Sequence, residues 1–405
     1  MVYDAIVVGA GPAGSLTALH LAKEGLKVLV LEAELFPRPK ACGGGLQERA
    51  TSHIPLDWRT VVRSQLSDIT FTYQFGDRFT RSSRSTLVYG VLRSEFDEFL
   101  LNAAKNCGAS VRHGVRAVRL ARNGPSGVLL ETSHGEVAGR FLIGADGANS
   151  VVANSLNSRQ NYYWQAGMYA EIPLTLVQER VSTSIRIDWG LLPGGYAWIF
   201  PKNGSVNVGA GSLCSMGKML RSYVGRLLAE EGLLKPGAAE QVRLRGHQLP
   251  TLTKRTQLSR WSVLLVGDAA GLVDPLTGDG ISQACHSATL AAQAVMASAE
   301  TRRFDLSEYE YLVRREIGRE LNDSRKLLAL TVAFPRIVYD VFKNSDGVWE
   351  SFCKVLRGEA SIRSLREKLL GPLRSAWFLI EPLLPRLEKY RISGATTESL
   401  FALGE

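Results

Sequence analysis

The chain has 405 residues, too many for one ordinary hydrophobic core, so the length fits roughly two to three domains. Hydrophobic residues make up 45% and charged residues 21% of the chain, which is typical of a globular protein and excludes a fibrous, disordered or coiled-coil one. The net charge of +9 favours anionic partners such as nucleotides, diphosphates or a lipid surface. Without a lysine-rich tail or zinc-like Cys/His spacing, no nucleic-acid partner is expected.

The first 32 residues carry the strongest local signal. Residues 5–8 are a short apolar run of the kind found in buried parallel strands, and residues 15–23 have helical spacing. Between them, Gly9 permits a tight turn, Gly11 lets the backbone approach a pyrophosphate, and Gly14 allows close packing of helix on strand. A second apolar run over residues 27–31 ends at Glu32, where a carboxylate can bind a ribose. This pattern predicts a dinucleotide site, but the acid alone does not separate FAD from NAD.

Two later segments repeat the arrangement of an apolar strand followed by a Gly/Asp turn. Residues 141–150 form the first, and residues 263–270 form the second, with Asp268 at the strand end. The second segment runs through Gly280 into a small-residue helix that is expected to begin near Ile281. A carboxylate at such a strand end can bind a ribityl hydroxyl, while the helix N-terminus faces the carbonyls of an isoalloxazine ring. These segments favour FAD.

Residues 160–245 change to short alternating runs, which predict an antiparallel sheet with one face toward a pocket. Within it, Tyr196, Trp198 and Phe200 alternate onto one side of a strand. They form either a smooth apolar wall for a long hydrocarbon or an aromatic stripe of the core. Residues 301–405 are expected to be helical. The basic, aromatic segment 369–387 predicts either a helix in a lipid interface or a helix that caps the substrate domain.

Cysteine usage and the start of the chain bear on the compartment. The cysteines are dispersed with no CxxC pair, which favours a reducing compartment over a disulfide framework. No signal peptide or spanning helix is predicted, because no uninterrupted apolar stretch reaches about 18 residues. We therefore expect a cytoplasmic protein with, at most, peripheral membrane contact. None of the six histidines forms a close, metal-like pair in the sequence, so no metal site is expected. The cysteines are Cys42, Cys107, Cys214, Cys285 and Cys353.

With these motifs in order, the chain resembles the FAD-dependent oxidoreductases of the p-hydroxybenzoate hydroxylase class and, more narrowly, the geranylgeranyl reductase family. Residues 36–46 match the family's flavin-loop pattern, and Arg93 begins a match to its FAD-contacting arginine helix. Residues 193–201 match its PxxYxWxFP motif at every specified position. The resemblance covers nearly all of residues 1–300.

The resemblance implies the roles of individual residues. Tyr196, Trp198 and Phe200 would position the substrate, and Cys42 would lie above the isoalloxazine and take part in catalysis. Cys42 as a small apolar filler and Arg93 as a surface salt bridge are the alternative interpretations. The implied contacts to FAD are Gly9, Gly11, Pro12, Ala13, Gly14, Glu32, Gly43, Gly44, Arg93, Ala117, Asp268, Gly280 and Ile281.

The implied fold is α/β: a Rossmann-like FAD-binding domain, an antiparallel-sheet substrate domain and a C-terminal helical extension. The expected division is residues 1–160 and 245–300 for FAD, 161–244 for substrate and 301–405 for the extension. The implied activity is reduction of isolated C=C bonds in geranylgeranyl or related isoprenoid chains linked to diphosphate, chlorophyll or lipid. NADPH or reduced ferredoxin would supply the electrons.

Two rival functions share this fold. A flavin-dependent monooxygenase or halogenase is the first, because residues 193–201 overlap the halogenase WxWxIP motif. Tyr196 stands in place of its first tryptophan and Phe200 in place of its isoleucine, and both departures favour the reductase. The second rival is a non-catalytic flavin or isoprenoid carrier, which the complete flavin motifs disfavour.

Overall fold

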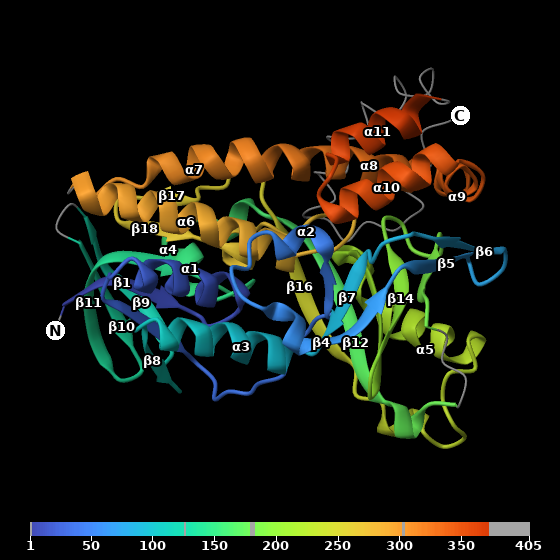
Figure 1. The fold of residues 1–405 in the computed structure, drawn as a ribbon, viewed down its shortest axis with the longest axis horizontal. Coiled ribbons are helices and arrows are strands. Elements are labelled where there is room, and N and C mark those ends of the chain that lie inside the picture. The colour runs from blue at the N-terminus through green and yellow to red at the C-terminus, as the bar shows by residue number, and fades with distance from the viewer. Residues whose placement is uncertain (1, 125–126, 179–182, 302–303, 372–405) are drawn as a thin grey trace.

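The computed structural model describes residues 2–124, 127–178, 183–301 and 304–371. Two sheets stand side by side, one at the end of the molecule where the N-terminus lies and one at the opposite end. A layer of helices lies across both sheets (Figure 1). Two large hydrophobic clusters, one in each half, stabilise this arrangement. The α/β fold class expected from the sequence is confirmed, including the C-terminal helices.

The first sheet has eight strands, and its centre is parallel. β1 pairs in parallel with β2 and β11, and β11 pairs in parallel with β18. The residues of β2 before Glu32 are apolar and the whole strand is buried, so the centre of the sheet is covered on both faces. The strands are β1 (Val2–Val8), β2 (Val28–Glu32), β8 (Ser110–His113), β9 (Ala117–Gly124), β10 (Gly127–Thr132), β11 (Gly135–Gly144), β17 (Ser259–Arg260) and β18 (Val263–Leu265).

Three long helices accompany this sheet and pack on one another. α1 contacts both α3 and α6. α6 is rich in alanine, and small side chains allow its backbone to approach α1 closely. The helices are α1 (Pro12–Lys23), α3 (Arg93–Asn106) and α6 (Ile281–Thr301), and the short helices of this half are α2 (Glu48–Thr51) and α4 (Val151–Ser155).

The second sheet has seven strands, in the order β16-β12-β15-β14-β13-β5-β6. It is antiparallel except where β13 pairs in parallel with β5. α5 (Leu220–Glu230) packs on the face of β12, β14 and β15. The strands are β5 (Asp68–Tyr73), β6 (Arg78–Ser82), β12 (Tyr163–Pro173), β13 (Ile185–Trp189), β14 (Tyr196–Lys202), β15 (Ser205–Leu213) and β16 (Arg245–Thr251).

The second sheet takes in more of the chain than the range 161–244 that the sequence predicts for the substrate domain. β5 and β6 come from the range expected for the first FAD segment, and β16 comes from the range expected for the last. The division of the chain into four domain segments therefore stays a prediction. A smaller sheet lies between the halves and consists of β3 (Gly45–Gln47), β4 (Val62–Leu66) and β7 (Val88–Val91).

Short 3-10 helices join several of these elements. They are η1 (Trp58–Val61), η2 (Arg159–Asn161), η3 (Leu174–Leu176), η4 (Cys214–Met219), η5 (Ala239–Gln241) and η6 (Gly267–Ala270). Of these, η6 follows β18 directly and carries Asp268.

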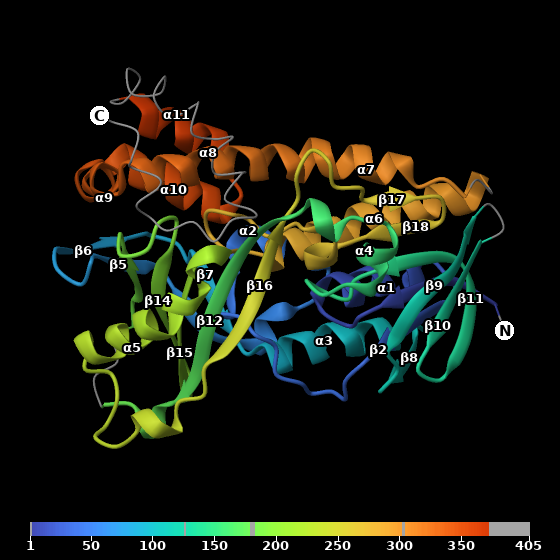
Figure 2. The same ribbon diagram turned by 180° about the vertical axis from the view of Figure 1, so that it is seen from behind.

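The described C-terminal residues form helices that run along α6 and then over the second sheet (Figure 2). A π-helical turn, η7, continues α7 into α8, and Pro335 occupies the first turn of α9, a position where proline is tolerated. Segment 369–387, predicted as an interfacial or capping helix, lies almost wholly outside the described residues. The helices are α7 (Ser307–Val313), η7 (Arg314–Gly318), α8 (Arg319–Ala333), α9 (Pro335–Asn344), α10 (Asp346–Arg357) and α11 (Ile362–Leu370).

Two further expectations concern cysteines and membranes. All five cysteines are free in the structure. Among the described helices, none combines the length and the apolar character that crossing a membrane requires.

Candidate functional site

A cavity of about 460 Å³ lies between the two sheets. All predicted site residues except Gly14 line this cavity. From the first half they are Gly9, Gly11, Pro12, Ala13, Glu32, Cys42, Gly43, Gly44, Arg93, Ala117, Asp268, Gly280 and Ile281, and from the second half Tyr196, Trp198 and Phe200. The structure thus brings the nucleotide motifs and the aromatic motif to one space.

Three glycines shape the turn between β1 and α1 in different ways. Gly9 has φ +99°, and a Cβ on it would lie 2.3 Å from the Ala145 carbonyl oxygen. A Cβ on Gly14 would lie 2.0 Å from the Gly9 carbonyl oxygen, so Gly14 serves helix packing outside the cavity. Gly11 faces the cavity, where the nearest atom to its Cβ would be an Arg38 nitrogen 4.0 Å away. The N-terminal amides of α1 are therefore open to a ligand phosphate.

Glu32 lies at the end of β2 and is nearly buried, at 5% exposure. Its Oε2 accepts a hydrogen bond from the Ala10 amide at 2.8 Å, and its Oε1 accepts one from the Glu34 amide at 3.0 Å. The Arg38 guanidinium is 3.6 Å from the same carboxylate. These contacts fix the carboxylate at the cavity edge, where it can accept hydrogen bonds from a sugar.

Arg93 begins α3 and forms a buried ion pair rather than a surface one. Its Nε and Nη2 donate to the two oxygens of Asp97 at 2.7 and 2.9 Å, and Asp97 is fully buried. Arg38 donates to the same carboxylate at 3.3 Å. One carboxylate thus holds two guanidinium groups, and both line the cavity.

The loop that contains Cys42 is held from both halves of the protein. The Cys42 Sγ accepts a hydrogen bond from the Gly44 amide at 3.3 Å and also contacts the Arg93 guanidinium. From β15, the Asn207 side chain donates to the Cys42 carbonyl oxygen at 3.1 Å. Cys42 is partly buried, and its thiol has polar partners, which argues against a purely apolar filler.

The aromatic residues of β14 form one wall of the cavity. Their ring centroids are 5.8 Å apart from Tyr196 to Trp198 and 6.3 Å apart from Trp198 to Phe200. The alternate residues Ala197 and Ile199 point the other way, into the core of the second half. The aromatic stripe is therefore a wall of the cavity, and the alternate residues of the same strand contribute to the hydrophobic core on the opposite face.

Polar bonds behind the wall fix its orientation. Trp198 Nε1 donates to the Asn207 amide oxygen at 2.8 Å, and Asn207 also donates to Glu171 at 2.8 Å. The Tyr196 hydroxyl donates to the Thr277 carbonyl oxygen. Burial, together with the carboxylates of Asp274 and Asp279, raises the pKa of this hydroxyl well above its ordinary value. Tyr196 therefore holds a loop in place and is a poor acid.

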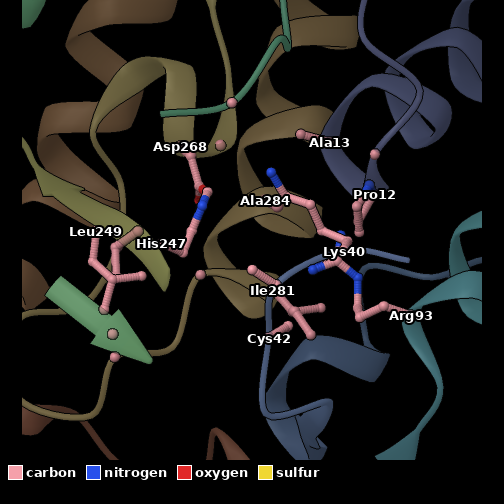
Figure 3. Close-up of a pocket in the computed structure, with 18 of the residues that line it drawn as sticks. Pro12, Ala13, Lys40, Cys42, Arg93, His247, Leu249, Asp268, Ile281 and Ala284 are labelled. Carbon is pink, nitrogen blue, oxygen red and sulfur yellow. The ribbon is translucent and has the colours of Figure 1, made fainter. Parts of the chain in front are cut away.

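The sequence analysis did not single out several charged or titratable residues of the cavity; besides Arg38, two of them matter here. The first is Lys40, whose ammonium lies in the cavity beside Gly147 and Arg93 (Figure 3). Burial lowers the pKa of this ammonium, against the opposing effect of the Asp268 carboxylate. The second is His247, which extends from β16 toward Asp268. Alternation along β16 is the signal that was available, because His247 and Leu249 both line the cavity.

The residues present fit FAD. The open amides beside Gly11 and the cations of Arg38, Lys40 and Arg93 suit a diphosphate, and Glu32 suits a ribose. Among the described residues, no cluster of three or more His, Cys, Asp or Glu side chains could hold a metal ion.

Comparisons with known proteins agree with this site. Residues 2–179 match the family model described as an FAD binding domain. The chain is 31% identical over 349 residues to digeranylgeranylglycerophospholipid reductase 2 of Methanothermobacter thermautotrophicus, covering 80% of this chain and 87% of that one. It is 32% identical over 363 residues to menaquinone reductase of Mycobacterium tuberculosis, covering 83% and 85%.

Solved structures show the same fold. A geranylgeranyl bacteriochlorophyll reductase-like protein from Thermoplasma acidophilum superposes with a TM-score of 0.71 and 24% identity, over 96% of this chain and 99% of that one. The flavin-dependent brominase Bmp2 superposes with a TM-score of 0.70 and 18% identity, over 93% and 100%. At these identities both likenesses concern the fold alone.

Proposed function

Because this chain belongs to the geranylgeranyl reductase family of FAD-dependent oxidoreductases, we propose that it reduces isolated C=C bonds in geranylgeranyl or related isoprenoid chains. The observation that carries the proposal is the single cavity lined both by the nucleotide motifs and by the wall of Tyr196, Trp198 and Phe200. An isoprenoid chain is long and apolar, and such a wall can hold it without hydrogen bonds.

In this proposal each part of the chain has a separate task. Bound FAD supplies the hydride chemistry. The amides at Gly11 and the cations around the cavity hold its charged groups, and the wall aligns the double bond and excludes water. The aromatic faces also stabilise positive charge that develops when the alkene is protonated. Cys42 is the side chain that we propose takes part in the chemistry, because its thiol lies on the cavity between Gly44 and Arg93.

The finer assignments also belong to this proposal. NADPH or reduced ferredoxin serves as the electron donor, and the substrate chain is carried by a diphosphate, a lipid, a chlorophyll or a quinone. The relatives named for a phospholipid and for menaquinone support a lipid-linked chain. Such a substrate makes contact with a membrane surface useful to a cytoplasmic enzyme, and the net charge of +9 suits an anionic surface.

The test is an anaerobic single-turnover experiment. The FAD-loaded protein is reduced and mixed in turn with geranylgeranyl diphosphate, digeranylgeranylglycerophospholipid and menaquinone, while flavin absorbance and product mass are followed. Reoxidation with a gain of two hydrogens per reduced bond is expected for at least one substrate. The menaquinone product is exposed to air before its mass is measured, which returns a reduced ring to the quinone, so any remaining gain lies in the isoprenoid chain. If the flavin stays reduced until oxygen enters, and the product gains oxygen or halogen, the protein is a monooxygenase or halogenase instead.

Two matched substitutions tie the result to the wall. Trp198→Ala removes an indole from the cavity, whereas Trp261→Ala removes one that is 50% exposed elsewhere. We expect the first to slow substrate-dependent reoxidation roughly tenfold or more and the second to leave it unchanged. Equal rates in the two variants would remove the wall from the mechanism.

A further inference from the structure

His247 and Asp268 face each other across the boundary between the two halves. His247 lies on β16 of the second sheet, and Asp268 lies in η6, directly after β18 of the first. Figure 3 shows the imidazole pointing toward the carboxylate. Their nearest atoms, Nε2 and Oδ2, are 3.5 Å apart, which is longer than an ordinary N–H···O hydrogen bond.

Both groups keep unused hydrogen-bonding capacity. His247 Nε2 is buried and has no hydrogen-bond partner within the described part of the chain. Of the described residues, none other than His247 offers the Asp268 carboxylate a charged partner within salt-bridge distance. An unpaired buried donor is costly, so a ligand that satisfies both groups would be bound favourably.

The two groups together select one kind of ligand atom. Lys40 and Arg93 lie close enough to Asp268 for their positive charges to act on its carboxylate. Burial alone raises the pKa of its carboxyl, but His247 and these cations hold that pKa below its ordinary value, so the carboxylate is an acceptor. An imidazole N–H beside it is a donor. A hydroxyl can donate to the Asp268 carboxylate and accept from the His247 imidazole, whereas a phosphate oxygen would be repelled by the carboxylate.

The resemblance already implies that Asp268 binds a hydroxyl of the ribityl chain of FAD; we propose that His247, from the second sheet, binds the same hydroxyl and forms a clamp with Asp268. The second sheet would thereby contribute a cofactor-binding residue as well as the substrate wall. Pairing within the sheet sets the position of His247, since Gly167 lies opposite it on β12 and leaves the imidazole free of a neighbouring side chain. The inference rests on the FAD half of the proposed function and does not depend on which substrate is reduced.

The first test is FAD affinity of the cofactor-free protein, measured by quenching of flavin fluorescence. His247→Leu is expected to weaken FAD binding roughly tenfold, which corresponds to the loss of one hydrogen bond. His247→Gln keeps a donor and should weaken FAD binding less. His134→Gln, a change at an exposed turn, is the matched control and should bind as the natural protein does.

The second test identifies the hydroxyl. FAD analogues that lack the 2′, 3′ or 4′ ribityl hydroxyl are titrated into the natural protein, His247→Leu and Asp268→Asn. We expect one analogue to bind about tenfold more weakly than FAD to the natural protein, and this penalty to disappear in both variants. A merely structural histidine would lower affinity for all the flavins equally.

Two results would overturn the clamp. The first is that the natural protein binds FAD and all three analogues with equal affinity. The second is that the loss of affinity for the one weakened analogue is the same in the natural protein, in His247→Gln and in His247→Leu. Thermal unfolding of the cofactor-free variants separates misfolding from lost binding, and the conservative His247→Gln remains informative if His247→Leu does not fold. Since the readout is binding, failure of the clamp leaves the reductase test unaffected.

Discussion

At the scale of single residues, two glycines of one turn are predicted to fail in different ways. A methyl group on Gly14 would lie 2.0 Å from the Gly9 carbonyl oxygen, so Gly14→Ala must displace backbone, at a cost of about 3 kcal/mol or more. A methyl group on Gly11 meets nothing closer than 4.0 Å and enters the cavity. Gly11→Ala should therefore change the stability of the cofactor-free protein by less than about 0.5 kcal/mol and weaken FAD roughly tenfold.

Denaturant unfolding and FAD titration of the two variants check this contrast. Gly11→Ala should unfold as the natural protein does and bind FAD about tenfold more weakly. Gly14→Ala should already lose about 3 kcal/mol or more in the free energy of unfolding. Normal FAD affinity in Gly11→Ala would mean that the α1 amides do not hold a phosphate.

The Tyr196 hydroxyl gives a second prediction at this scale. It donates to the Thr277 carbonyl oxygen, and its pKa is raised by burial, so it is unsuited to releasing a proton. Tyr196→Phe should cost about 1 kcal/mol of stability through the lost hydrogen bond, and the pH dependence of single-turnover flavin reoxidation should keep its shape. An alkaline limb that disappears in the variant would instead identify Tyr196 as the acid.

At the scale of elements, α3 depends on one buried carboxylate. Asp97 is fully buried and holds both Arg93 and Arg38, so Asp97→Asn removes the counter-charge of Arg93 and leaves Arg38 with Glu32 alone. We expect a loss of about 3 kcal/mol in the free energy of unfolding. Glu95→Gln on the same helix is the control. Its pair with Arg63 is more than one-third exposed and should be worth less than about 1 kcal/mol. Similar losses in the two variants, measured by denaturant unfolding, would contradict this.

The strand pair β14–β15 holds the Cys42 loop through Asn207, which is fully buried. Its side chain bonds the Trp198 indole, the Cys42 carbonyl oxygen and Glu171. Asn207→Leu leaves these groups without their hydrogen-bond partner, so we expect a loss of about 2 kcal/mol in the free energy of unfolding and faster release of FAD. Asn203→Leu, at the exposed turn between the strands, should change neither quantity. Unaltered FAD release in Asn207→Leu would separate the loop from the cofactor.

At the scale of the whole molecule, the sequence predicted whatever depends on local pattern. The turn from Gly9 to Gly14 and the alternation of Tyr196, Trp198 and Phe200 are written in neighbouring residues. The pairing of β5 with β13 joins segments more than 110 residues apart, and no local period encodes it. The approach of His247 to Asp268 is of the same kind, because each residue belongs to a different sheet.

The packing of the C-terminal helices on the FAD half gives the last prediction. His53, just after α2, stacks on His286 of α6 with ring centroids 4.3 Å apart, and Glu316 of η7 bonds His286 at 3.0 Å. Burial is the main cause that lowers the pKa of His53 from 6.5 to about 4, and the charges of His286 and His20 act in the same direction. The Glu316 carboxylate opposes this shift. Burial also lowers the pKa of His286.

Because the folded-state pKa of His53 lies below the unfolded value, the unfolded chain binds more protons between these two values. Stability is therefore complete above pH 6.5 and falls as the pH drops toward about 4. His53→Gln removes this titration, so the variant should gain on the order of 1 kcal/mol relative to the natural protein between pH 7 and pH 4.5, after allowance for partial exposure of the ring. Denaturant unfolding at both pH values, with FAD saturating and His134→Gln as control, measures the gain. If all three proteins lose the same stability between pH 7 and pH 4.5, protonation of His53 does not contribute to the acid sensitivity of the fold.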